Sequence, residues 1–322
     1  MASKQSADSA LSARACAKIN LTLRLTGRRP DGYHNLRTVL QSLALHDTLR
    51  FHATRGAFQI ECEHPACPTG RANLVWRTAE LVWRSAGRRG LPRDVVVTIE
   101  KRIPLQAGLG GGSSDAAAAI RGLSRVWHLD LSRDRHQAIA AALGADVPFF
   151  LEGGTALGVE RGDLLFPLVD LTPAWVTLVI PPFGVSTKDA YRWWDSMKRG
   201  RNPFLRAASQ KGVRPLFDDR LRLSGSGFAD SPALRLSTGE LRNDLEGPVV
   251  AHHPEINRML RALRRQGAAY AAMSGSGSAV FGLFELQAAA EHAARLSASR
   301  GCRTLVTRTV SRANYRRVSA PR

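Results

Sequence analysis

Runs in which apolar and polar residues alternate are typical of strands with one buried face, and this chain contains several. The first covers residues 14–25, where three leucines share one face and Lys18 lies on the opposite one. The second covers residues 39–51 and predicts a strand with a turn around His46-Asp47. Shorter strands are expected over residues 95–99, 155–159, 175–180, 269–273, 279–284 and 304–310.

Apolar residues spaced three or four apart predict several helices. Asn73 and Ser132 are suited to cap the start of two of them, and Gly144 is suited to end the second. Residues 198–240 are rich in Arg, Ser and Gly with little periodicity, so we expect a loop with one short helix there. Helices are expected over residues 74–84, 116–127, 132–143, 188–197, 254–266 and 287–299.

Strands and helices alternate irregularly along the chain, which favours an α+β fold over a doubly wound sheet. With 322 residues the chain is long enough for two cores, and the pattern weakens between residues 160 and 170. We therefore expect a disordered extension over residues 1–14, an N-terminal domain over 15–162 and a C-terminal domain over 163–322. The extension lacks the apolar centre of a secretory signal, and no run approaches a membrane span, so a cytoplasmic protein is expected.

A glycine-rich loop between the strand at 95–99 and the helix near Ala116 is the main candidate for chemistry. Its four glycines in five positions let the backbone approach a ligand or adopt positive φ, and Ser113, Ser114 or Asp115 could cap the helix. Free N–H groups at a helix N-terminus favour phosphate. The loop lacks the lysine of a P-loop and the third glycine of a dinucleotide site, and a flexible turn is the alternative. Its residues are Pro104, Leu105, Gln106, Ala107, Gly108, Leu109, Gly110, Gly111, Gly112, Ser113 and Ser114.

Other polar residues at strand and turn positions could complete a site. Lys18 lies on a predicted strand, and Asp146 lies at a predicted helix-to-strand corner before an apolar run. Tyr33 and His34 follow an Asp-Gly turn and could form one wall of a ligand site. Each also has a plain structural interpretation, as a solvated lysine, a turn aspartate or loop residues.

The net charge of +19 and the cysteine pattern change this picture little. Such a charge favours an anionic partner, either nucleic acid or a phosphorylated small molecule. The arginines are scattered from Arg24 to Arg322, however, which favours a solvated basic surface. Cys62, His64 and Cys67 resemble half of a zinc site, but no second ligand pair has metal spacing, so we expect a loop and no metal ligands.

Several separated segments together resemble the GHMP kinases. Residues 104–115 are similar to the ATP-binding signature of that family. Residues 17–21 and 31–35 resemble the N-terminal motifs of one branch of it, and residues 144–148 and 273–278 resemble later motifs of the same branch, in the expected order. The resemblance runs from about Arg14 to the last predicted strand.

The resemblance implies a two-domain GHMP kinase fold with the active site between the domains. The N-terminal, ATP-binding domain would be like domain 2 of ribosomal protein S5, and the C-terminal domain would be ferredoxin-like. The implied reaction transfers a phosphoryl group from ATP, with Mg²⁺, to the 2-hydroxyl of a methylerythritol linked to cytidine diphosphate, in non-mevalonate isoprenoid biosynthesis.

The resemblance also assigns roles to particular residues. Asp146 would take the proton of the attacking hydroxyl, and Lys18 would lie beside it and keep it ionised. Ser113 and Ser114 are candidates for contact with phosphate or magnesium. The remaining implied contacts are Asn73, Lys101 and residues 104–114 at the nucleotide, and Tyr33, His34, Thr187 and Tyr191 at the acceptor.

Two other functions stay open at this point. A GHMP kinase of the homoserine or mevalonate type would share the glycine-rich loop but not the set of Tyr33, His34 and Tyr191. A basic RNA-binding protein of S5-like fold would not need Lys18 and Asp146 together. We expect a small-molecule substrate, no membrane or nucleic-acid partner, and a monomer or homodimer.

Overall fold

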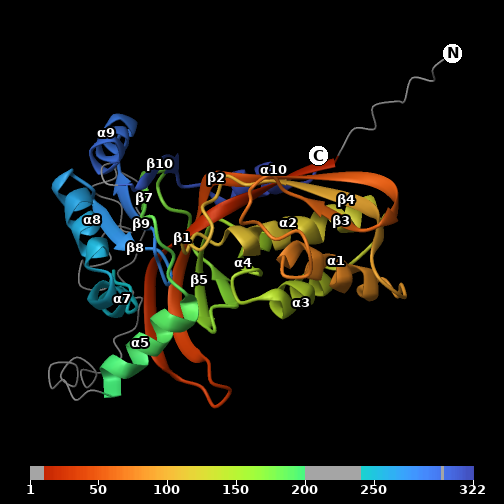
Figure 1. Ribbon diagram of the computed structural model, residues 1–322, viewed down its shortest axis with the longest axis horizontal. Helices are drawn as coiled ribbons and strands as arrows, with labels where there is room; N and C mark the ends of the chain where they lie inside the picture. The colour runs from red at the N-terminus through yellow and green to blue at the C-terminus, as the bar shows by residue number, and fades with distance from the viewer. Residues whose placement is uncertain (1–10, 200–240, 299–300) are drawn as a thin grey trace.

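The fold consists of two sheets covered by helices, as a computed structural model of the chain shows (Figure 1). The structure describes residues 11–199, 241–298 and 301–322. A six-stranded sheet has the order β3-β4-β2-β5-β6, with β1 paired to β2, and a four-stranded sheet has the order β10-β7-β9-β8. The predicted α+β class is therefore confirmed.

The first sheet is built on a long antiparallel pair, β1 (Leu11–Arg28) and β2 (His34–Ala57). Its helices α1, α2 and α3 lie together on one face (Figure 1). The other elements of this part are β3 (Gln59–Glu61), α1 (Leu74–Ser85), β4 (Arg93–Glu100), α2 (Gly111–Val126), α3 (Arg133–Leu143), α4 (Phe149–Glu152), β5 (Thr155–Glu160) and β6 (Leu164–Pro167).

Helix α2 lies close against the first sheet because its buried side is made of small residues. The four alanines at 116–119 are fully buried, and a Cβ atom at Gly122 would overlap the ring of Phe51 on β2. Small side chains allow a helix axis to approach a sheet closely, and close packing makes the position of the helix sensitive to small volume changes. This contact holds α2 against the sheet, and the glycine-rich loop ends at the N-terminus of that helix.

The second sheet carries α8 and α9 on its outer side (Figure 1). The last helix, α10, returns to the first sheet, where the Tyr315 hydroxyl donates to the Phe150 carbonyl at 2.6 Å. The elements of this part are β7 (Trp175–Ile180), α5 (Thr187–Arg199), α7 (Glu246–His252), α8 (Pro254–Arg265), β8 (Tyr270–Met273), β9 (Val280–Phe284), α9 (Gln287–Ser297), β10 (Arg303–Arg308) and α10 (Arg312–Ser319).

The two sheets share one hydrophobic cluster, which holds the site elements in a fixed relation. Ile19 and Leu21 of β1 pack in it with Val176 of β7 and Phe281 of β9, and Leu109 of the glycine-rich loop belongs to the same cluster. Strand β1 therefore contributes to the first sheet and to the contact with the second. Side chains on β1 are well placed to meet residues from both.

Several predicted boundaries were wrong. Residues 11–14, expected in a disordered extension, belong to β1, and residues 1–10 lie outside the described part. The first sheet extends through β6 to Pro167, past the expected domain boundary at 162, and α10 packs on the first sheet although it follows the second. Residues 200–240, expected to form a loop with a short helix, lie outside the described residues.

Local predictions also failed where tertiary contacts override sequence pattern. The turn expected at His46-Asp47 is absent because β2 continues through it. The strand expected after Asp146 is instead a turn followed by the short helix α4. Helix α2 begins at Gly111, with Gly110 as its N-cap, so Ser113, Ser114 and Asp115 lie inside the helix. No helix within residues 11–199, 241–298 and 301–322 is long and apolar enough to cross a membrane.

Candidate active site

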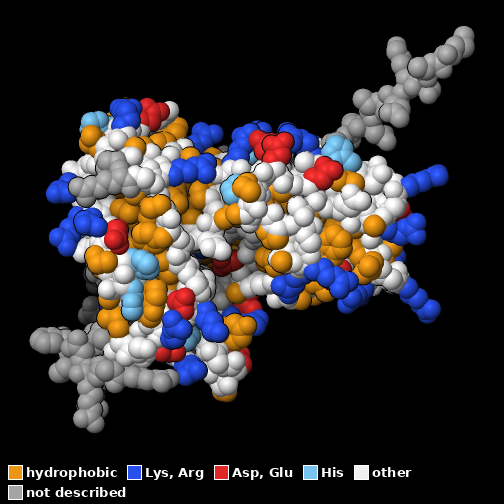
Figure 2. Space-filling view, in the orientation of Figure 1, with side chains coloured by type: hydrophobic (Ala, Val, Ile, Leu, Met, Phe, Trp, Pro, Cys, Tyr) orange, Lys and Arg blue, Asp and Glu red, His pale blue; other side chains and the backbone are white. Residues whose placement is uncertain are grey.

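A pocket of about 830 Å³ lies between the two parts of the molecule. Figure 2 shows the surface hollowed there, between the half with α8 and α9 and the half with α1 to α3. The lining comes from β1, the glycine-rich loop, the turn before α4, the start of α5 and the loop after β8. Sequence segments separated by more than 250 residues therefore meet at one concave site.

The glycine-rich loop borders this pocket and is anchored by its carbonyl groups. The Leu109 carbonyl accepts the Lys18 N–H at 3.0 Å, and the Gly108 carbonyl accepts the Ser274 hydroxyl at 2.9 Å. Gly108 and Gly110 have φ values of 75° and 73°, which favour glycine. The first N–H groups of α2, at residues 111–113, have no partner within the helix and border the pocket. This arrangement suits an anionic group such as phosphate.

Lys18 and Asp146 form an ion pair at the same pocket. The Nζ atom of Lys18 lies 3.6 Å from Oδ2 of Asp146, and it donates to Oδ1 of Asn20 at 2.6 Å. The lysine side chain is buried, whereas that of Asp146 is 42% exposed. Asp146 thus presents a carboxylate to a group bound in the pocket.

A second buried ionic cluster ties the end of β4 to the start of α2. The Lys101 ammonium donates to Asp47 and, at 2.8 Å, to Oδ2 of Asp115. Asp47 also accepts the backbone N–H groups of Arg102 and Ile103 at 2.6 and 2.8 Å. Asp115 keeps one oxygen, Oδ1, without a hydrogen-bond partner, and burial raises the pKa of its carboxyl group to about 7 despite the neighbouring Lys101.

Aromatic residues gather where β2 meets α5. The rings of His34 and Tyr191 are stacked with centroids 5.0 Å apart, and Nε2 of His34 lies 2.9 Å from Oδ1 of Asp195. Tyr191 borders the pocket. Tyr33 is 61% exposed, with the Arg161 guanidinium 5.8 Å above its ring. The histidine thus joins the first sheet to α5 through contacts with the rings of Tyr191 and Trp194 and through one hydrogen bond.

Comparison with known proteins decides the family. Two family models match, GHMP kinases N terminal domain over residues 73–154 and GHMP kinases C terminal over residues 232–299. A 4-diphosphocytidyl-2-C-methyl-D-erythritol kinase from Pelotomaculum thermopropionicum is 42% identical over 301 residues, which cover 93% of this chain and 98% of the relative. The chain belongs to the 4-diphosphocytidyl-2-C-methyl-D-erythritol kinase family, within the GHMP kinases.

Solved structures agree with this assignment. A crystal structure of a 4-(cytidine 5'-diphospho)-2C-methyl-D-erythritol kinase is 33% identical with a TM-score of 0.70, covering 92% of this chain and 98% of that one. Homoserine kinase from Cytophaga hutchinsonii has a TM-score of 0.69 at 16% identity, covering 100% of this chain and 99% of that one. At that identity the likeness shows the shared fold alone. The GHMP kinase fold predicted from the sequence is confirmed.

The pocket of this GHMP kinase brings together many of the residues predicted for the site. Lys18, Asp146, Thr187, Tyr191 and residues 104–113 all border it. Lys18 and Asp146 come from segments 128 residues apart in the chain and meet as an ion pair, in the relation that the sequence analysis expected. Thr187 begins α5 and its hydroxyl lies 3.0 Å from that of Ser276, in the loop after β8.

Five other predicted residues do not border the pocket. The Ser114 hydroxyl donates to the Cys16 carbonyl at 2.7 Å, and Asn73 caps α1 while donating to the Pro68 carbonyl at 2.7 Å. Lys101 is held in its ionic cluster, and neither Tyr33 nor His34 is among the lining residues. For these residues a role in binding stays a prediction.

The structure adds pocket residues that the sequence analysis did not select. Asn20 and Thr38 border the pocket beside Lys18, and Asp189 and the glycines of the 275–277 loop border it from the second part. Asn20 and the glycines of the 275–277 loop lie within residues 17–21 and 273–278, two of the segments that resemble family motifs, and this resemblance was the signal for them. No signal pointed to Thr38, because its position depends on how β2 pairs with β1.

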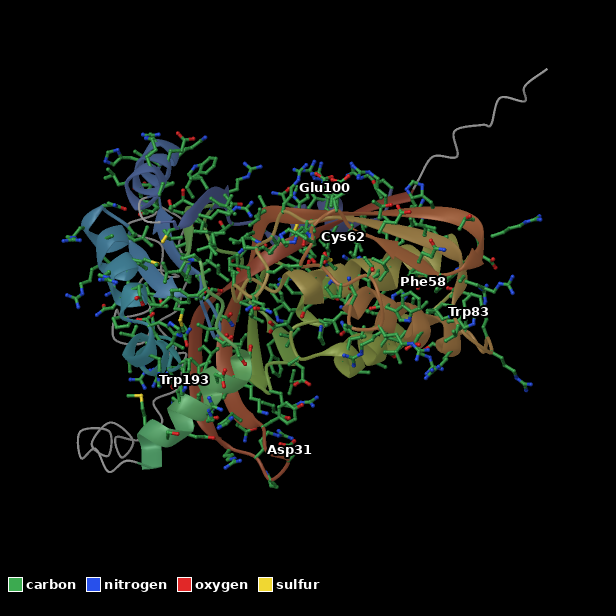
Figure 3. The ribbon with its side chains drawn as sticks, in the orientation of Figure 1. Asp31, Phe58, Cys62, Trp83, Glu100 and Trp193 are labelled. Carbon is green, nitrogen blue, oxygen red and sulfur yellow. The ribbon has the colours of Figure 1, made fainter. Side chains whose placement is uncertain are left out.

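The segment with the two nearby cysteines forms the connection between β3 and α1, where Figure 3 labels Cys62. The structure contains no group of three or more His, Cys, Asp or Glu side chains able to hold a metal, as far as its described residues extend. The Asn73 side chain donates to Sγ of Cys67 at 3.7 Å and so connects this segment to the cap of α1.

Replacing Asp115 by Asn tests the second ionic cluster. The buried Asp115 has a pKa of about 7, against 3.8 for an ordinary aspartate. Because the folded protein holds this proton more tightly than the unfolded chain does, the Asp115 carboxyl group stabilises the fold fully below pH 3.8. This contribution to stability is lost as the pH rises through 7. The free energy of unfolding of Asp115→Asn, relative to that of the native protein, should therefore be higher at pH 8 than at pH 5. Each unit of difference in pKa corresponds to about 1.4 kcal/mol. Urea unfolding at both pH values measures this.

The matched control is Asp47→Asn in the same cluster. Asp47 neutralises Lys101 and accepts two backbone N–H groups, so its replacement should destabilise the protein at both pH values. An equal stability difference for Asp115→Asn at pH 5 and pH 8 would show that the Asp115 carboxyl does not titrate in this range.

Proposed function

We propose that this chain transfers the γ-phosphoryl group of ATP to the 2-hydroxyl of 4-diphosphocytidyl-2-C-methyl-D-erythritol, a step of non-mevalonate isoprenoid precursor biosynthesis. The observation that carries the proposal is the Lys18–Asp146 pair, which borders the same pocket as the N-terminus of α2. The family supports the choice of acceptor, because a relative named 4-diphosphocytidyl-2-C-methyl-D-erythritol kinase is 42% identical along almost the whole chain.

The N-terminus of α2 is proposed to hold the triphosphate. The unpaired N–H groups at residues 111–113 and the positive end of the helix dipole both favour negative charge. A Cβ atom at Gly110 would lie 2.7 Å from the Phe150 ring and 3.1 Å from Cγ of Lys18. Glycine at this position therefore keeps the loop, the lysine and α4 in contact, and the phosphates can approach the backbone.

Asp146 is proposed as the general base. Phosphoryl transfer depends mainly on positioning and on stabilising charge, with a base that accepts the proton of the attacking hydroxyl. Oδ2 of Asp146 would accept this proton, and the Lys18 ammonium would keep the carboxylate ionised and orient the same hydroxyl. The burial of Lys18 strengthens its effect because few water molecules screen it.

Magnesium is expected to arrive with the nucleotide. Mg²⁺ is usually held by one or two protein oxygens together with substrate phosphates and water. The Ser113 hydroxyl is an oxygen ligand at the pocket, and it fits an ion held mainly by the triphosphate. When bound, the ion would neutralise charge on the phosphoryl group being transferred.

The acceptor is proposed to bind towards α5. Tyr191 would stack on the cytosine ring, and Thr187 would contact the chain that links it to the reacting hydroxyl. One side of Tyr191 is already covered by His34, whose orientation is fixed by Asp195. Tyr33 does not border the pocket whereas Tyr191 does, so the proposed aromatic contact is with Tyr191.

A substrate panel tests the proposed function. Purified protein is incubated with ATP, Mg²⁺ and, in separate reactions, 4-diphosphocytidyl-2-C-methyl-D-erythritol, homoserine or mevalonate, and ADP release is measured. We expect turnover with the cytidine-linked acceptor and none above background with the other two. Preferential turnover of homoserine or mevalonate would overturn the proposal.

Asp146→Asn and Lys18→Met should each lower kcat by roughly 100-fold or more, which is the usual scale for acid–base groups. The apparent KM for ATP should change little, because neither side chain belongs to the phosphate-binding N–H groups. Steady-state kinetics with the cytidine-linked acceptor measures both quantities. A folded variant with near-native kcat would exclude that residue from the chemistry.

Tyr191→Ala should raise the KM for the cytidine-linked acceptor by roughly fivefold or more, since one stacking contact with a base is worth about 1–3 kcal/mol. The KM for ATP should stay within twofold of the native value. Tyr191→Phe keeps the ring and serves as the control, with near-native kinetics. If Tyr191→Ala mainly lowers the melting temperature, the residue packs the fold and the cytidine assignment is wrong.

A further inference from the structure

The Lys18 ammonium is the first member of a chain of hydrogen bonds that continues through Asn20 and Thr38 to the backbone of Thr22. Lys18 donates to Oδ1 of Asn20 at 2.6 Å, and Nδ2 of Asn20 donates to Oγ1 of Thr38 at 2.8 Å. The Thr38 hydroxyl then donates to the carbonyl oxygen of Thr22 at 2.6 Å. All four residues are buried.

The direction of this chain follows from the chemistry of its members. An ammonium group only donates, so Asn20 must present its carbonyl oxygen to Lys18 and its NH₂ group to Thr38. The Thr38 hydroxyl has one hydrogen, which is bonded to the Thr22 carbonyl, so it meets Asn20 as an acceptor. Each link therefore fixes the next, and the orientation of the Asn20 amide depends on Thr38.

Two irregularities in β1 bring these groups together. The pairing of β1 with β2 shifts register between Cys16 and Lys18 and again between Asn20 and Thr22. Such bulges redirect side chains from their regular positions on a strand. Thr38 itself lies on β2, opposite Leu23 of β1 and Gly158 of β5, so its place is fixed on both sides.

We propose that Thr38 is a positioning residue for phosphoryl transfer, acting through Asn20 on Lys18. This inference rests on the proposed function, because it concerns the lysine paired with the general base. Without the Thr38 oxygen, the Asn20 NH₂ group loses its acceptor on that side, and the amide that accepts from Lys18 is no longer held in one position. Lys18 would then lose its fixed position beside Asp146.

The experiment compares Thr38→Val, which keeps the branched shape and removes the acceptor, with Thr38→Ser, which keeps the hydroxyl. In the kinase assay, Thr38→Val should lower kcat roughly five- to tenfold, the rate effect of one hydrogen bond. The KM values for ATP and for the acceptor should stay within twofold. Thr38→Ser should retain near-native kcat. If Thr38→Val does not fold, Thr38→Ala is compared with Thr38→Ser in the same way.

A double-mutant cycle separates positioning from a general loss of stability. If Thr38 acts through Asn20, Thr38→Val should cause no further loss of kcat in an Asn20→Ala background. Thr177→Val is the matched control, since the buried Thr177 hydroxyl on β7 donates to the Ala290 carbonyl at 2.7 Å and does not border the pocket. It should lower stability and leave kcat unchanged.

The outcomes are distinct. Native protein that does not phosphorylate the cytidine-linked acceptor overturns the proposed function. Active native protein together with a fully active Thr38→Val variant overturns the positioning role alone. Additive losses in the cycle, or a Thr38→Ser variant as slow as Thr38→Val, also overturn it, because the effect would then not pass through the hydroxyl and Asn20.

Discussion

The site depends on keeping the Lys18 ammonium buried and charged between the two parts of the molecule. A buried charge is strongly destabilising unless it is paired and hydrogen-bonded. Asp146 supplies the opposite charge, and Asn20 supplies a close acceptor. Because Lys18 lies on β1, whose neighbouring residues Ile19 and Leu21 belong to the core shared by both sheets, this arrangement requires that core to be intact.

The glycine-rich loop is placed by constraints at both of its ends. Before it, Lys101 is fixed in a cluster with Asp47 and Asp115, which joins β4 to α2. After it, α2 is pressed against β2 at Gly122. The loop itself is bonded to β1 and to the loop after β8 through its carbonyl groups. Its backbone therefore needs little rearrangement to receive a ligand, which lowers the entropic cost of binding.

Contacts between the two parts complete the pocket from distant segments. His34 on β2 reaches Tyr191 and Asp195 on α5, and Thr187 reaches Ser276 after β8. The chain returns to the first sheet at its end, where Tyr315 packs over Gly153. The residues proposed to contact the acceptor are thus positioned by packing between elements rather than by any local motif.

Local periodicity in the sequence by itself determined the α+β class and most strands and helices. The resemblance of separated sequence segments to the GHMP kinases indicated the family, and it predicted Lys18, Asp146 and the glycine-rich loop as the centre of the site. The sequence did not determine that Asp47 lies within an unbroken strand, that α2 begins at Gly111, or that Ser114 turns towards Cys16. The tertiary structure alone decided these points and the link from Thr38 to Lys18, because strand register, bulges and burial arise from pairing between segments far apart in the chain.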